Sequence, residues 1–329
     1  MSAERFDGYV ERALYHPVRG FYAAGGQAGR RGDFLTSPEV GPLFGAVLAR
    51  ALDTWWHELG DPDPFTVVEA GAGPGTLART VALAAPECAA ALHYVTVERS
   101  AAQRAQHPGG IEALPELPDG PVTGVMLANE LLDNLPFRLL ERTADGWAEI
   151  WVEGGVEALV RLDDVDVPEG ATAHDEVPMG ARIPVQEQAA TWLREALALV
   201  ERGRVVVVDY ADSTPSMAAR PHQEWLRTYR SHGRGGDPLD SPGSQDITVE
   251  VAVDQLAAVR PPDHDRSQAE FLAAHGLDEL VDEGRRLWEE RAHLGDLAAI
   301  RARSRATEAD ALTDPAGLGA FRVLEWMVG

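Results

Sequence analysis

A glycine-rich turn after a predicted strand is the first stretch whose residue types indicate ligand chemistry. Residues 65–69 read as a β-branched strand that ends in Glu69, and glycines follow at every second position, Gly71, Gly73 and Gly75. Glycine permits positive φ and close backbone approach to a ligand, and the first strand–helix turn of a doubly wound α/β domain is a common ligand site. A glycine loop without function has the same pattern, so the turn alone does not distinguish a ligand site from an ordinary loop.

A second acid strengthens the case for a nucleotide. Glu98 ends the next predicted strand and follows Gly75 by 23 residues. An acid about 20 residues after such a loop binds the ribose hydroxyls in nucleotide-binding Rossmann folds. The turn contains no basic residue and departs from the G-x-G-x-x-G pattern, which argues against a dinucleotide. The pattern predicts an adenosine-containing ligand between two adjacent parallel strands.

A third group of polar side chains follows a third apolar run. Residues 124–128 have the length of a buried strand, and Asn129, Glu130 and Asp133 come directly after it. Polar groups at the carboxyl end of a strand lie where an open α/β sheet performs its chemistry. A helix N-terminus with a cap and an acidic first turn explains the same residues without chemistry. Both interpretations stay open at this point.

The elements that must position these residues form one main core with an insertion. Apolar residues at helical spacing predict helices at 6–14 and from Ser37 to near Gly60. Three short strands at 137–162 read as a β-meander, and residues 205–210 form the most strand-like run of the chain. Residues 211–248 are polar and irregular, which is typical of a lid or binding loop or of a disordered excursion. We therefore expect four parts, which are an N-terminal helical extension with a glycine-rich loop (1–60), the first half of the core (61–136), the inserted β-meander and helix (137–203), and the second half of the core with a lid-like loop at 211–248 (204–329).

Composition excludes several classes of protein. The 329 residues carry a formal net charge of −24 and contain no lysine, which disfavours broad binding to nucleic acid or to anionic membranes; an acidic surface also keeps a protein soluble. The one cysteine, Cys88, allows neither an internal disulfide nor a thiolate metal cluster, and we expect no metal. Because no signal peptide or membrane-spanning run is visible, we expect a soluble, cytoplasmic protein.

Several stretches occur together, and in this order, in one known family. They resemble the motifs of the MidA-like methyltransferases, which include the mitochondrial complex I assembly factor that methylates arginine. The resemblance spans nearly the whole chain, although Ala72 and Pro74 depart from the residues usual in the family loop. It implies an α/β fold with a Rossmann-like class I methyltransferase sheet of seven strands, the last antiparallel, and S-adenosyl-L-methionine as cofactor. The stretches that carry it are 20–22, 32–40, 44–45, 69–77, 128–136, 209–210, 242–248 and 267–272.

The resemblance also suggests a role for each candidate residue. Acids favour a cationic sulfonium electrostatically, and carboxylates bind and orient a guanidinium. The expected cofactor-binding residues are Glu69, Gly71, Gly73, Gly75, Glu98 and Asn129. The expected catalytic residues are Glu130 and Asp133, with Asn129 as a positioning group. The expected substrate-binding residues are Asp33, Thr36, Tyr210 and His232.

Three functions remain open from the sequence. The first is methylation of a protein arginine, with a protein substrate as the partner. The second is a small-molecule O- or N-methyltransferase, for which His232 or His222 is a candidate base. The third is an assembly factor that binds S-adenosylmethionine with little catalysis. The oligomeric state stays open.

Overall fold

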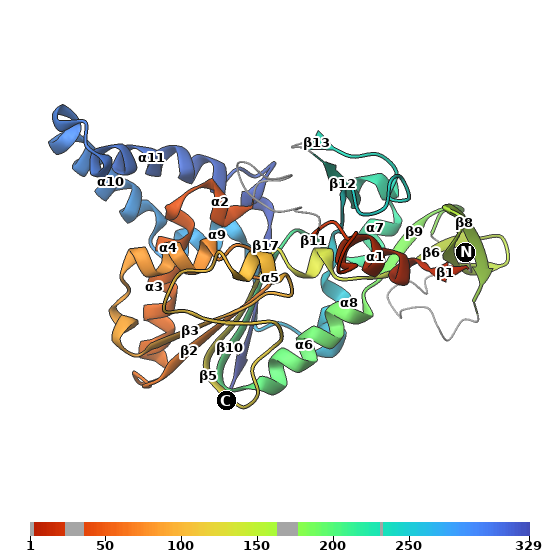
Figure 1. Cartoon of the computed structure of the whole chain (residues 1–329), viewed down its shortest axis with the longest axis horizontal. Helices are drawn as coiled ribbons and strands as arrows, with labels where there is room; N and C mark the ends of the chain where they lie inside the picture. The colour runs from red at the N-terminus through yellow and green to blue at the C-terminus, as the bar shows by residue number, and fades with distance from the viewer. Residues whose placement is uncertain (1–2, 24–35, 163–176, 231–232) are drawn as a thin grey trace.

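The computed structural model describes residues 3–23, 36–162, 177–230 and 233–329, and a mostly parallel sheet runs through this part of the chain (Figure 1). The sheet has seven strands in the order β16-β17-β10-β5-β2-β3-β4. Strand β17 is antiparallel to both of its neighbours, whereas β10, β5, β2, β3 and β4 are mutually parallel. The expected Rossmann-like sheet is confirmed. Its strands are β2 (Phe65–Ala70), β3 (Leu92–Val97), β4 (Glu112–Leu114), β5 (Val122–Asn129), β10 (Val200–Asp209), β16 (His264–Ser267) and β17 (Arg322–Val328).

Helices cover both faces of this sheet, as Figure 1 shows. In a strand, successive side chains point to opposite faces, and in β2 Val67 packs in one apolar cluster while Val68 packs in the other. The continuous apolar character of the parallel strands follows from burial on both sides. One cluster holds α3 (Pro42–Glu58), α4 (Thr76–Ala84), α9 (Gln268–Ala274) and part of α10 (Leu277–Arg291), and the other holds α6 (Glu187–Leu199) and α8 (Val253–Val259).

The inserted β-meander is confirmed and is larger than expected. Strands β6 (Arg138–Thr143), β7 (Gly146–Glu153) and β8 (Val156–Arg161) form it, and β9 (Arg182–Val185) extends it. The N-terminal β1 (Glu4–Arg5) also pairs with β7. This pairing was not predicted, because a strand of two residues has no periodic pattern in the sequence. Helix α1 (Phe6–Tyr15) then packs on the meander, with the rings of Phe6 and Phe137 5.5 Å apart.

The expectation of irregular structure at 211–248 is wrong for most of the described residues up to 234 and for 246–248, whereas 235–245 contain no helix or strand. The short elements β11 (Ala211–Asp212), α7 (Thr214–Ala218), η5 (His222–Glu224), β12 (Leu226–Arg230), β13 (Gly233–Arg234) and β14 (Asp246–Val249) build this region, and β11 pairs with β15 (Val251–Ala252). Trp225 and Ile247 are buried against α1 residues in a third apolar cluster. Buried apolar side chains such as these, packed against residues distant in sequence, stabilise a segment whose local composition is polar. The four-part division of the chain stays a prediction.

The expected helix from Ser37 to near Gly60 is two helices, α2 (Ser37–Val40) and α3. Pro42 disfavours the α region for the residue before it, and Gly41 is extended, with φ of 166°. Helix α11 (Leu297–Leu312) closes this corner: Glu308 accepts a hydrogen bond from the Leu43 amide at 2.9 Å. No helix in the described ranges is long and apolar enough to cross a membrane.

A close contact inside the parallel sheet generates the first prediction. Gly124 in β5 has φ of 145°, and a Cβ there would lie 2.0 Å from the carbonyl oxygen of Thr66 in β2. We expect Gly124→Ala to lower the free energy of unfolding by about 3 kcal/mol or more, through strain and overpacking, measured by urea denaturation. Gly120→Ala is the matched control, because Gly120 has φ of 105° with no neighbouring atom within 4 Å; it should cost only about 1 kcal/mol. Equal costs at the two positions would contradict this account.

Candidate functional site

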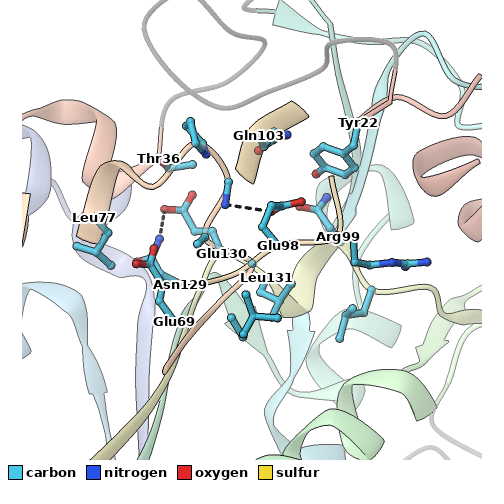
Figure 2. Close-up of a pocket in the computed structure, with 18 of the residues that line it drawn as sticks. Tyr22, Thr36, Glu69, Leu77, Glu98, Arg99, Gln103, Asn129, Glu130 and Leu131 are labelled. Atoms are coloured by element: carbon cyan, nitrogen blue, oxygen red, sulfur yellow. Dashed lines mark hydrogen bonds between the residues drawn. The ribbon is translucent and has the colours of Figure 1, made fainter. Parts of the chain in front are cut away.

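A cavity of about 690 Å³ opens at the carboxyl edge of β2, β3 and β5. Strand ends and the N-terminus of α4 meet there, as expected for an open α/β sheet. The predicted residues Glu69, Gly71, Gly73, Glu98 and Asn129 all line it (Figure 2). The sequence therefore identified the strand-end and glycine-turn groups of this cavity. Its other lining residues, Tyr15, Tyr22, Gln103 and Trp192 among them, were not predicted as site residues.

The glycine turn has the backbone that its composition predicts. Gly71, Gly73 and Gly75 have φ values of 70°, 53° and 75°. A Cβ on Gly71 would lie 2.8 Å from Cδ1 of Leu131. Gly75 does not line the cavity; it is the left-handed residue that precedes α4. Glycine is therefore required here by the left-handed backbone conformation at the start of α4, not by contact with a ligand.

Two acids flank this turn. Glu98 accepts hydrogen bonds from the Gly73 amide at 3.0 Å and the Ser100 amide at 2.7 Å, so it holds the loop as well as facing the cavity (Figure 2). Burial raises the pKa of Glu98. Glu69 is buried and accepts a hydrogen bond from the Tyr94 hydroxyl at 2.9 Å. Burial raises the pKa of Glu69 to about 8.

Asn129 and Glu130 end β5 in a strained turn. Glu130 has φ of 51°, although it is not glycine, and backbone strain of this kind often accompanies function. Its Oε1 accepts a hydrogen bond from the Ser37 amide at 2.9 Å. It accepts a second from Asn129 Nδ2 at 3.2 Å (Figure 2). Asn129 Oδ1 is buried without a hydrogen-bond partner among the described residues. Burial raises the pKa of Glu130 to about 8.

The helix-cap explanation of these residues is wrong. Only a short turn, η2 (Leu132–Asn134), follows, and its N-cap is Leu131 without a side-chain cap. Asp209 at the end of β10 supports this turn instead, because its Oδ2 accepts hydrogen bonds from the amides of Leu132 at 3.0 Å and Asp133 at 3.3 Å. The role of Asp209 was missed, although its place after the valine-rich strand is a usable signal.

A second cavity of about 910 Å³ adjoins Glu130, which lines both. Asp133 and Tyr210 also line it. Asp133 is buried, its Oδ2 accepts hydrogen bonds from the Tyr210 hydroxyl at 2.7 Å and Thr248 Oγ1 at 2.6 Å, and burial raises its pKa. Its Oδ1 has no partner within the part of the chain that the structure describes. This cavity therefore combines a fixed carboxylate with a free buried oxygen.

Asp246 is a further acid of the second cavity that the sequence did not single out. It accepts hydrogen bonds from Asn134 Nδ2 at 3.1 Å and from the Tyr22 hydroxyl at 3.2 Å, and burial raises its pKa to about 7. Because Tyr22 lines the first cavity, Asp246 links the walls of the two cavities.

The remaining predicted residues divide as follows. Of the expected substrate-binding residues, Thr36 lines the first cavity and Tyr210 lines the second, so these two lie in different cavities. Asp33 and His232 lie outside the described residues. His222 lines neither cavity.

A Rossmann-like sheet of this order, with an acid- and glycine-lined cavity at its carboxyl edge, defines the class I methyltransferases. A family model described as "Putative S-adenosyl-L-methionine-dependent methyltransferase" matches residues 47–265. The chain belongs to this family, so the resemblance to MidA-like methyltransferases is confirmed, and S-adenosylmethionine is its cofactor.

Curated relatives carry a more specific name. The chain is 29% identical over 287 residues to a Drosophila melanogaster protein named as a mitochondrial protein arginine methyltransferase NDUFAF7 homolog, covering 74% of this chain and 63% of the fly protein. It is 26% identical over 290 residues to human NDUFAF7, with 74% and 62% covered. The chain thus spans less than two thirds of these relatives. Both are named as mitochondrial; the cytoplasmic location expected for this chain stays a prediction.

A solved structure agrees over nearly the whole chain. A likely methyl transferase from Burkholderia thailandensis, bound to S-adenosyl-homocysteine, is 28% identical, with a TM-score of 0.80, and the match covers 99% of this chain and 88% of that protein. The features of the first cavity fit such a ligand: a glycine turn that permits close approach, two acids, and the free Oδ1 of Asn129.

Glu98 gives a direct test of the first cavity. We expect Glu98→Gln to raise the Kd for S-adenosylmethionine about tenfold to a hundredfold, because hydrogen bonds to a charged group contribute more than neutral ones. Isothermal titration calorimetry measures it. Glu112→Gln, on the exposed surface of β4, removes the same charge outside the cavity and should leave the Kd unchanged. Unchanged affinity in Glu98→Gln would remove Glu98 from the cofactor site.

The raised pKa of Glu130 makes stability depend on pH. An unfolded glutamate ionises near pH 4.3, whereas folded Glu130 stays protonated up to about pH 8. The folded state binds more protons in this window, so the free energy of unfolding falls as pH rises through it. We expect Glu130→Gln to flatten this fall by up to about 1.4 kcal/mol per pH unit, measured by urea denaturation at pH 5.5, 6.5 and 7.5. Parallel profiles for both proteins would show that Glu130 is not the titrating group.

Proposed function

We propose that this methyltransferase modifies an arginine side chain of a protein. The observation that carries the proposal is the position of Glu130, which lines both the cofactor cavity and a second, acid-lined cavity. In-line methyl transfer requires the acceptor nitrogen and the methyl donor to be aligned. A carboxylate between the two cavities is placed to orient an acceptor that enters from the second one.

The first cavity would hold the cofactor through its strand-end groups. Glu98 would accept hydrogen bonds from the ribose hydroxyls, and the turn at Gly71 and Gly73 would lie against the amino-acid end. The free Oδ1 of Asn129 would accept a hydrogen bond from a cofactor donor. Glu69 would act indirectly, since it is held by Tyr94. When bound, S-adenosylmethionine supplies an electrophilic methyl group.

The second cavity has the chemistry that a guanidinium requires. A guanidinium prefers carboxylates, and it stacks on aromatic faces. Glu130 and the free Oδ1 of Asp133 are the available acceptors. Tyr210 and Phe321 line the same cavity with their ring centroids 5.2 Å apart. Tyr210 and Thr248 would position Asp133 by holding its other oxygen.

Glu130 would also handle the proton. The acceptor nitrogen would form a bond to the methyl carbon while the carbon–sulfur bond of the donor breaks, with its electron pair staying on the sulfur of S-adenosylhomocysteine. The nitrogen would also lose a proton, since a guanidinium with a pKa above 12 enters fully protonated. An entering cation lowers the pKa of a nearby carboxyl group, so Glu130 would become ionised as the substrate binds and would accept this proton during transfer.

The names of the relatives support a protein arginine as acceptor. A small-molecule methyltransferase with His222 as the base receives less support, because His222 lines neither cavity. An assembly factor with little catalysis would retain the first cavity and leave Glu130 without a role in turnover.

Substitution of Glu130 separates these functions. We expect Glu130→Gln to lower kcat at least about a hundredfold, because it removes a preorganised charge at the reacting nitrogen. Its Kd for S-adenosylmethionine should stay within about threefold. Transfer of labelled methyl into a cell lysate, resolved by size and followed by amino-acid analysis for methylarginine, measures the reaction.

Glu289→Gln, on the exposed surface of α10, is the control and should keep full activity. Label confined to small molecules would contradict a protein acceptor. Full turnover in Glu130→Gln with intact cofactor affinity would contradict the role of Glu130.

A further inference from the structure

One wall of the second cavity is a hairpin that carries cations and no acid. Residues 226–236 contain Arg227, Arg230 and Arg234 but no aspartate or glutamate, in a chain with a net charge of −24. In the antiparallel pair β12–β13, Arg234 lies opposite Tyr229. Arg227, two residues before Tyr229 in β12, shares its face, and all three line the second cavity.

The arginines nearest the cavity interior are already neutralised. Arg227 binds Glu250 at 2.7 Å, and its guanidinium lies 5.5 Å from the ring centroid of Tyr210. Arg220, also in the cavity wall, binds both Glu250 and Asp212 at 2.7 Å. These ion pairs shape the wall and leave little charge for a ligand.

Arg230 and Arg234 differ from these arginines. Arg234 is exposed, and among the described residues its side chain forms no ion pair and makes only one long hydrogen bond, to the carbonyl of Gln223 at 3.5 Å. Arg230 is exposed, and its side chain has neither a hydrogen bond nor an ion pair within the described ranges. Both line a neighbouring hollow of about 510 Å³ whose one described acid is Asp240. Arg234 lines both this hollow and the second cavity, so the two spaces adjoin.

We propose that Arg230 and Arg234 bind carboxylates of the substrate near its target arginine, so that the preferred substrate is an arginine within an acidic segment. The inference rests on the proposed function, because it concerns the chain that surrounds that same arginine. Exposed guanidinium groups bind carboxylates in a planar, bidentate geometry. A protein with this net charge repels an acidic partner at long range, and a local cationic wall reverses that repulsion where the substrate must enter.

Two dye-labelled peptides test the proposal with the full-length protein and saturating S-adenosylhomocysteine. Both centre on an arginine flanked by two glycines on each side; one ends in two acidic residues on each side, and the other has the matching amides there. Fluorescence anisotropy gives Kd, and a parallel assay with S-adenosylmethionine gives kcat/KM. We expect the acidic peptide to bind about fivefold to tenfold more tightly, from a few exposed ion pairs, with the difference falling as salt is added.

Charge reversal assigns the effect to the hairpin. Arg230→Glu with Arg234→Glu should abolish the preference for the acidic peptide and leave the Kd for S-adenosylmethionine unchanged. The matched control is Arg286→Glu together with Arg301→Glu, two exposed arginines of α10 and α11, which makes the same change in net charge and should keep the preference.

The outcomes separate this inference from the proposed function. Equal binding of both peptides, or a preference that survives the hairpin reversal, would overturn the inference even if both peptides are methylated. Hairpin-dependent binding of the acidic peptide without any methylation would support the docking surface and count against arginine as acceptor. Tighter, hairpin-dependent binding of a labelled oligouridylate would overturn the choice of a peptide partner.

Discussion

Carboxyl groups buried where parallel strands end are the feature on which the rest of this protein depends. Glu69 and Asp133 are buried, Glu130 is half-buried between two cavities, and Asp246 is buried beside them at the start of the antiparallel strand β14. Burial raises the pKa of each of these four acids. A buried acid is costly when ionised and unpaired. A site built in this way is therefore suited to cations, because a bound positive charge stabilises an ionised carboxylate in place of the water that burial removed. A sulfonium donor and a guanidinium acceptor both meet that requirement.

The surrounding structure holds these acids by contacts from distant parts of the chain. The Ser37 amide binds Glu130, and Ser37 Oγ in turn binds Gln268 of α9. Glu308 of α11 holds the start of α3 at Leu43, next to the same corner. The helices beyond the sheet thus contribute to the geometry of the cavity as well as to the apolar core. Substitutions in these helices are expected to change the position of Glu130 through the same contacts.

Local chemistry made part of the site visible in the sequence. A glycine turn after an apolar strand is typical of the first strand–helix turn of an α/β domain, and Glu98 follows it at a characteristic sequence separation. Both were therefore identified, together with Glu69 and Asn129. The break at Gly41, the pairing of β1 with β7 and the ordered elements at 211–248 were not predicted. The break at Gly41 has a local signal in Pro42 that the helical periodicity concealed. The β1–β7 pairing and the elements at 211–248 depend on residues far along the chain, for which the local pattern contains no signal.

The sequence by itself determined the parallel strands β2, β3, β5 and β10, the glycine turn and the acids at the strand ends, because these follow from periodicity, from the conformational freedom of glycine and from short spacings. The seven-stranded sheet was expected from the family resemblance. Only the tertiary structure decided that Glu130 lines two cavities, that Tyr210 and Thr248 fix Asp133, and that Thr36 and Tyr210 lie in different cavities. It also separated Arg227, which an ion pair neutralises, from Arg234, which has none among the described residues. The physical reason is that burial and pairing are set by what packs against a side chain, and most of those neighbours are remote in sequence.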